Sequence, residues 1–205
     1  MSNNEKEEKL NLITLGNSAV GKTSYILKYT ENNFQPVYLT TIGVDFKSKE
    51  ITLNDKKYKI IFYDTTGEER FRSIAVNTVK NAHGIVLMYD ITKKKTFEDI
   101  SLWMKGIKEI KPDNFPIILI GNKCDLKEER EVKTTDGENL ANEYNIGFYE
   151  TSNKDGINIE ESCLNLINRV IAYNKNLKKS NEVRQEGVKL KNKGSKKTKK
   201  SSGCC

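Results

Sequence analysis

One short segment, residues 16–23, constrains the fold of this chain more than any other. It fits the phosphate-binding pattern G-x-x-x-x-G-K-[ST] with the residues Gly16-Asn17-Ser18-Ala19-Val20-Gly21-Lys22-Thr23. The apolar run at residues 10–15 predicts a buried strand before it, and residues 24–29 predict the start of a helix after it. A glycine-containing turn without chemistry would not need strand, loop, Lys-Thr pair and helix together.

The pattern assigns a phosphate-binding role to each part of the segment. Glycine permits backbone conformations in which successive N–H groups face α- and β-phosphates at the positive end of a helix. Lys22 would reach the β- and γ-phosphates as a point charge, and the hydroxyl of Thr23 would ligate Mg²⁺. The candidate nucleotide-binding residues here are Asn17, Ser18, Ala19, Val20, Gly21, Lys22 and Thr23.

Strand and helix signals alternate along the rest of the chain. Residues 44–51 predict an edge strand, and Asn54-Asp55 a turn into a second strand at residues 58–63. Later strands are predicted at residues 84–89, 117–120 and 146–149, with a helix through Trp103 after the first of them and a last helix from about residue 158 to 173. This alternation predicts an α/β fold with a mostly parallel sheet and helices on both faces. Together with the phosphate-binding segment it predicts a P-loop NTPase with six strands. Ligands in such sheets bind at the carboxyl ends of the strands.

Asp64-Thr65-Thr66-Gly67 directly follows a predicted strand. Asp64 could hold the metal through water, beside Thr23, and the backbone N–H of Gly67 could reach the γ-phosphate. D-x-x-G alone is mostly a turn sequence. Here it lies one hairpin after the phosphate loop, which favours the functional interpretation.

Two further loops follow predicted strands and suit a purine base. In Asn122-Lys123-Cys124-Asp125, the Asp125 carboxylate can accept paired hydrogen bonds from the N1–H and exocyclic amine of guanine, a pair that adenine does not offer. Asn122 would brace neighbouring loops, and the stem of Lys123 would lie along the ring. The second loop, Ser152-Asn153-Lys154, can offer a backbone N–H to the guanine carbonyl. N-K-x-D alone is also a good turn sequence, so its order behind the other two motifs matters.

With these motifs in this order, residues 9–173 resemble a small GTPase of the Ras superfamily. The Rab branch fits best, on residues 41–46, residues 70–74 and Cys204-Cys205. The resemblance implies that Thr41 joins the metal and meets the γ-phosphate, and that Phe34 packs against the guanine. It also implies switch segments at residues 35–46 and 66–79, and a catalytic set of Lys22, Thr41, Gly67 and Glu68.

Four motifs depart from the usual Rab pattern. Glu68 stands where D-T-A-G-Q-E has the water-positioning glutamine, and Thr66 stands for its alanine. Tyr63 replaces a tryptophan, residues 78–82 replace Y-Y-R-G-A, and Asn153 replaces the alanine of S-A-K. The resemblance predicts a GTP/GDP switch in vesicle trafficking with slow, assisted hydrolysis. The alternative, resting on Glu68 and Thr66, is a membrane adaptor that holds GTP with negligible turnover.

The net charge of +7 is concentrated at one end of the chain. The segment from residue 175 carries 11 Lys and Arg and 2 Asp and Glu, a net +9, which leaves −2 for the rest. A Lys-rich run can contact nucleic acid, coat an anionic membrane or stay solvated. We expect an N-terminal extension at residues 1–8, a GTP-binding domain at 9–174 and a flexible basic tail at 175–205.

The tail carries the expected membrane signal. Terminal Cys-Cys is a Rab prenylation signal by resemblance, so Cys204 and Cys205 are the lipidation candidates. No apolar run has the length of a spanning helix, and residues 1–9 do not resemble a secretory signal. We expect a monomer on the cytoplasmic face of an intracellular membrane, with a cytosolic pool.

The resemblance also implies a set of partners. They are an exchange factor, an activating protein, a Rab escort protein, a GDP-dissociation inhibitor and GTP-state effectors. Nucleic acid is not expected, because the tail lacks the aromatics on which single strands stack. His83 and Cys163 are expected to be structural, and Trp103 to pack in the core or at its rim.

Overall fold

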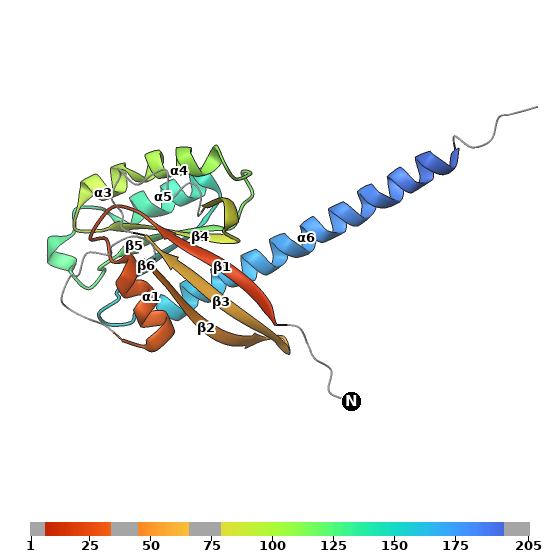
Figure 1. The fold of residues 1–205 in the computed structure, drawn as a ribbon. Coiled ribbons are helices and arrows are strands. Elements are labelled where there is room, and N and C mark those ends of the chain that lie inside the picture. The colour runs from red at the N-terminus through yellow and green to blue at the C-terminus, as the bar shows by residue number, and fades with distance from the viewer. Residues whose placement is uncertain (1–6, 34–44, 66–78, 195–205) are drawn as a thin grey trace, which may run out of the picture. The chain divides into compact units, whose positions relative to one another are not determined.

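The computed structural model describes residues 7–33, 45–65 and 79–194, with side chains as far as residue 180. The chain divides into two compact units, Met1–Val170 and Ile171–Cys205. The first unit holds the sheet and all the described candidate site residues. It is an α/β fold with a six-stranded sheet, as predicted (Figure 1).

The sheet has the strand order β2-β3-β1-β4-β5-β6. All of its pairs are parallel except the pair of β2 with β3. The strands are β1 (Glu8–Leu15), β2 (Asp45–Leu53), β3 (Lys56–Asp64), β4 (Gly84–Asp90), β5 (Ile117–Asn122) and β6 (Gly147–Thr151). Figure 1 shows α3, α4 and α5 on one face, and α1 with the first turns of α6 on the other.

Continuous apolar runs form the centre of the sheet. Every residue of β4 and β5 is buried, as expected for inner parallel strands with helices on both faces. The edge pair differs, because Asn54 (φ 49°) and Asp55 (φ 62°) both adopt the left-handed conformation. Two such residues make a two-residue hairpin turn, which sets the antiparallel register of β2 on β3.

The helices are α1 (Lys22–Glu31), α3 (Lys94–Glu98), α4 (Ile100–Lys108), α5 (Thr134–Tyr144) and α6 (Ile159–Gly194), with a short 3₁₀ turn, η2, at Lys127–Glu129. The helix predicted to run through Trp103 is divided at Asp99 into α3 and α4. The prediction also omitted α5, whose sequence is largely polar and buries only Gly137 and Ala141. Two small buried residues give too weak a pattern to identify a helix.

The last helix ends later than predicted. We expected its end at about residue 173, but α6 continues to Gly194. Residues 174–186 contain no glycine or proline and are rich in Lys, Glu, Arg and Gln, which favour helix. Among the described residues, no helix is both long and apolar enough to span a bilayer.

Candidate nucleotide-binding site

The loop between β1 and α1 has the backbone that the phosphate-binding pattern requires. Gly16 (φ 133°), Ala19 (φ 63°) and Gly21 (φ 103°) all have positive φ. At Gly16 a Cβ would collide with the carbonyl oxygen of Met88 on β4. Glycine at this position is therefore required both by conformation and by close approach of the sheet.

Lys22 begins α1 with its ammonium inside the loop. Its Nζ donates to the carbonyl oxygens of Gly16 (3.1 Å) and Asn17 (2.9 Å), and only 5% of the residue is exposed. Burial lowers the pKa of Lys22 to about 8, against the opposing effect of the nearby Asp64 carboxylate. A cation desolvated to this degree gains strongly from an anion such as a phosphate.

Thr23 and Asp64 meet at the end of β3. The Thr23 hydroxyl donates to Asp64 Oδ2 at 2.5 Å, and Thr14 Oγ1 donates to Asp64 Oδ1 at 3.4 Å. Thr65 Oγ1 donates to the carbonyl oxygen of Thr14, which fixes the start of the following loop. A hydroxyl beside a carboxylate fits Mg²⁺, which takes oxygen ligands and is usually held by one or two protein groups plus phosphates. No group of three or more His, Cys, Asp or Glu suited to a metal occurs in the described part of the chain.

Asn122, the last residue of β5, joins the base loops to the phosphate loop. Its Nδ2 donates to the carbonyl oxygen of Val20 at 2.8 Å, and its Oδ1 accepts from Thr151 Oγ1 at 3.1 Å. Asn153 adds a second link, because its Nδ2 donates to the carbonyl oxygen of Gly21 at 2.9 Å. The three predicted nucleotide-binding segments are thereby brought together at one edge of the sheet.

The remaining residues of the base loops lie around these links. Asp125 follows Lys123, which has the left-handed conformation at φ 68°, and the Cys124 N–H donates to the carbonyl oxygen of Thr151. Ser152 is buried and its Oγ accepts from the backbone N–H of Asp155, whereas Lys154 is exposed. The Asp125 side chain forms no hydrogen bond or ion pair with another residue that the structure describes, and its carboxylate can accept hydrogen bonds from a ligand.

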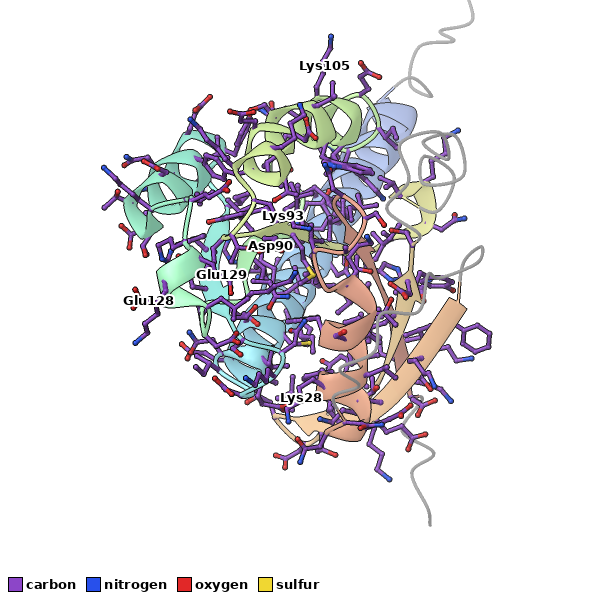
Figure 2. The ribbon with its side chains drawn as sticks, turned by 90° about the vertical axis from the view of Figure 1, so that its left-hand side faces the viewer. Lys28, Asp90, Lys93, Lys105, Glu128 and Glu129 are labelled. Carbon is purple, nitrogen blue, oxygen red and sulfur yellow. The ribbon has the colours of Figure 1, made fainter. Side chains whose placement is uncertain are left out.

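Asp90, at the end of β4, is a site residue that the sequence did not indicate. Its side chain lies inside the globular unit, whereas Lys105 and Glu128 project outward (Figure 2). Asp90 Oδ2 forms an ion pair with Lys123 Nζ at 2.5 Å, and Oδ1 accepts from the N–H and hydroxyl of Thr92. The carboxylate therefore anchors the ammonium of Lys123, whose stem is expected to lie along the base. The local sequence around Asp90, residues 89–92, does not by itself indicate this ion pair.

Trp103 contributes more than packing. From α4, its indole Nε1 donates to Asn17 Oδ1 at 2.9 Å, and Asn17 Nδ2 donates to Asp99 Oδ2 at 2.7 Å. Asp99 also pairs with Lys95 on α3 at 2.7 Å. The side chain of Asn17, predicted to contact nucleotide, is thus held by the α3–α4 junction.

Several predicted site residues lie outside the described residues. They are Phe34, Thr41, Thr66, Gly67, Glu68, Cys204 and Cys205, together with most of both switch segments.

The two residues expected to be structural are described. Cys163 is fully buried on α6, and His83 accepts a hydrogen bond at Nδ1 from the N–H of Asn11. Burial and the nearby Lys111 lower the pKa of His83.

Comparison with known proteins gives consistent matches. The Ras family model matches residues 11–172. "Ras-related protein Rab-13" of Rattus norvegicus is 38% identical over 180 residues, 88% of this chain and 89% of that protein. "Ras-related protein Rab-3A" of Homo sapiens is 40% identical over 156 residues, 76% of this chain and 71% of that protein. "GTP-binding protein Rab-3D" of Rattus norvegicus is 41% identical over 150 residues, 73% and 68% of the two chains.

Proposed function

The chain belongs to the Ras family, and within it to the Rab small GTPases, and we propose that it is a GTP/GDP switch in intracellular vesicle trafficking. The observation that carries the proposal is the link between the base and phosphate loops. Asn122 and Asn153 on the base side both donate to carbonyl oxygens of the phosphate loop. Such links support one ligand that carries a purine at one end and phosphates at the other.

Ras and Rab proteins are GTPases, and the residues of this chain suit phosphoryl transfer. The buried ammonium of Lys22 would bind the β- and γ-phosphates. Thr23 and Asp64 would hold Mg²⁺, which when bound neutralises charge on the phosphate oxygens. Thr41 and Gly67 are proposed to contact the γ-phosphate, and Glu68 to lie beside the attacking water.

We propose that the rate of GTP hydrolysis depends on Glu68. A glutamine donates to the γ-phosphate and accepts from the attacking water, whereas an ionised glutamate can only accept. Its negative charge is also repelled by the phosphate oxygens. We propose slow hydrolysis that an activating protein assists, because Rab activating proteins are expected to supply both an arginine and a glutamine. A carboxylate acting as a base on the water would partly offset the repulsion.

The adaptor alternative also rests on Glu68, together with Thr66. It predicts a protein that holds GTP and turns over negligibly even with an activating protein. The switch proposal predicts reversible cycling between partners: an exchange factor, an activating protein and GTP-state effectors. An escort protein and a GDP-dissociation inhibitor are proposed to handle the prenylated chain.

Single-turnover GTP hydrolysis separates the two functions. The wild type, Glu68→Gln and the matched control Glu69→Gln are compared across pH 5.5 to 8.5, with and without a Rab activating protein. We expect slow unassisted hydrolysis, a faster rate in Glu68→Gln, and strong stimulation of the wild type. A wild type that the activating protein does not stimulate, beside a stimulated Glu68→Gln, would support the adaptor. Superimposable rates and pH profiles for wild type and Glu68→Gln would remove Glu68 from the mechanism.

A further inference from the structure

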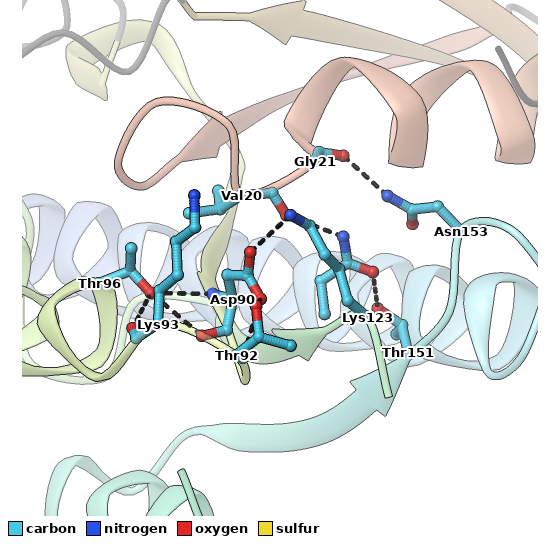
Figure 3. Close-up of polar contacts among 10 residues, drawn as sticks. Val20, Gly21, Asp90, Thr92, Lys93, Thr96, Lys123, Thr151 and Asn153 are labelled. Atoms are coloured by element: carbon cyan, nitrogen blue, oxygen red, sulfur yellow. Dashed lines mark hydrogen bonds and ion pairs between the residues drawn. The ribbon is translucent and has the colours of Figure 1, made fainter. Parts of the chain in front are cut away.

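The side chain of Asn153 makes a contact that the usual residue at its position cannot make. Asn153 follows β6 by two residues and is only 4% exposed. Its Nδ2 donates to the carbonyl oxygen of Gly21 at 2.9 Å (Figure 3). The Rab pattern has alanine here, in S-A-K, and an alanine side chain has no hydrogen-bond donor.

The partner atom lies at a sensitive point of the phosphate loop. Gly21 is the N-cap of α1, directly before Lys22 and Thr23, and has φ 103°. A Cβ on Gly21 would lie 2.8 Å from Asn153 Nδ2 and would collide with the amide of Asn122. The absence of a side chain at Gly21 therefore allows both amides to approach the loop closely.

The second polar atom of the Asn153 amide, Oδ1, indicates that this side chain does more than stabilise the fold. Asn153 Nδ2 must face the carbonyl oxygen of Gly21, because turning the amide over would place Oδ1, an acceptor, against another acceptor. Oδ1 therefore points away from the phosphate loop. Oδ1 is buried and has no hydrogen-bond partner among the residues that the structure describes. A buried acceptor without a partner is unfavourable for folding, and alanine would remove it.

We propose that Asn153 is a positioning residue that locks the base-recognition loop, residues 151–154, onto the phosphate loop and slows release of guanine nucleotide. With the bond in place, the base end and the phosphate end of the site cannot separate independently. The inference rests on the proposed binding of guanine nucleotides. It adds one residue, Asn153, that slows the release of guanine nucleotide through a side chain that the usual Rab sequence lacks.

The test measures release of fluorescently labelled GDP from the full chain. Asn153→Ala removes the donor, and Asn153→Asp keeps the shape of the side chain but places a carboxylate against the Gly21 carbonyl. We expect release to be about 3- to 10-fold faster in Asn153→Ala, as for loss of one buried hydrogen bond, and faster still in Asn153→Asp. The control is Asn165→Ala, the same substitution at a residue on α6 whose side chain contacts Arg169. It should release GDP at the wild-type rate.

Two further measurements separate positioning from a structural role. The fold-change in Asn153→Ala should be the same with Mg²⁺ and with excess EDTA, because the bond joins Asn153 to the Gly21 carbonyl and uses neither of the proposed metal ligands, Thr23 and Asp64. The unfolding midpoint of the nucleotide-free protein should be unchanged or slightly raised. Release of GDP at the wild-type rate by either Asn153→Ala or Asn153→Asp would overturn the proposal. The proposal would also be overturned if Asn153→Ala lowered the unfolding midpoint of the nucleotide-free protein as much as that of the GDP-bound protein. A wild type that fails to bind GDP would instead overturn the proposed function, before any variant is compared.

Discussion

Three buried charged residues converge at the carboxyl edge of the sheet. Lys22, Asp64 and Asp90 are 5%, 4% and 0% exposed, and they come from α1, β3 and β4. Buried charges are unfavourable unless they are paired and hydrogen-bonded, so their concentration at one edge is typical of a functional site. Two of the three were identified from sequence motifs. Asp90 was not, because its role depends on a partner distant in sequence.

Base selectivity is predicted to depend on Asp125. A site built around a buried pair of hydrogen bonds rejects a ligand that lacks its partners by roughly 10⁴-fold or more, so adenine nucleotides should bind poorly. Asp125→Asn should shift the preference from guanine to xanthine, whose additional carbonyl needs a donor. Competition binding with GDP, XDP and ADP measures this. Asp113→Asn, an exposed carboxylate elsewhere, is the control, and intact guanine selectivity in Asp125→Asn would contradict the assignment.

The Asp90–Lys123 pair should show an asymmetric response to mutation. Lys123→Met leaves the fully buried Asp90 carboxylate without its countercharge, whereas Asp90→Asn leaves an ammonium that is 31% exposed and can be hydrated. Breaking a buried pair by removing one partner costs about 3–5 kcal/mol, and we expect Lys123→Met to fall near the lower end of that range. Asp90→Asn should cost less.

The double variant decides whether the two residues act as a pair. Asp90→Asn combined with Lys123→Met should be more stable than Lys123→Met alone, because the unpaired charge is gone. Urea unfolding of the nucleotide-free protein gives all four free energies of unfolding. Strictly additive losses would show that the two side chains act independently.

Most of the strands, turns and loops that carry a local sequence pattern were predicted from the sequence. The apolar runs of β4 and β5, the Asn54-Asp55 turn and the phosphate loop each carry a short-range signal, and each was located to within a few residues. The polar α5 and the division at Asp99 were not predicted. α5 has few apolar residues, and Asp99, at the break, accepts a hydrogen bond from Asn17, which is far away in the chain.

The α3–α4 junction is predicted to support the phosphate loop through Trp103. Trp103→Phe keeps an aromatic ring but removes the donor to Asn17 Oδ1, a loss of about 1 kcal/mol. Release of labelled GDP should become about fivefold faster, in line with that loss. Leu102→Ala, at an exposed residue of the same helix, should leave the rate unchanged. In an Asn17→Ala background, Trp103→Phe should have no further effect; an additive effect would place the action of Trp103 elsewhere.

For the molecule as a whole, charge and apolar packing are divided between the two units. Among the residues whose side chains the structure describes, the buried apolar ones lie in Met1–Val170, whereas the excess of lysine in the sequence lies from residue 175 onward. The described helix continues into the basic segment as far as Gly194, and its sequence there is largely polar. A helix without an apolar face gains little from packing. We propose that this segment links the GTP-binding unit to a membrane surface.

Membrane attachment is predicted to depend on Cys204 and Cys205 more than on the lysines. Two prenyl chains satisfy the requirement of two signals for stable anchoring, while each lysine near an anionic surface adds only about 1 kcal/mol. Changing both cysteines to serine should move the full chain from the membrane fraction of cells to the soluble fraction. Cys124→Ser, the same change in the globular unit, should stay with membranes. Replacing Lys196, Lys197, Lys199 and Lys200 with glutamine should weaken attachment mainly at low salt, because the surface charge is screened within about 10 Å at 0.1 M. Membrane retention of the double cysteine variant, lost when the lysines are also replaced, would show that charge anchors the chain and prenylation does not.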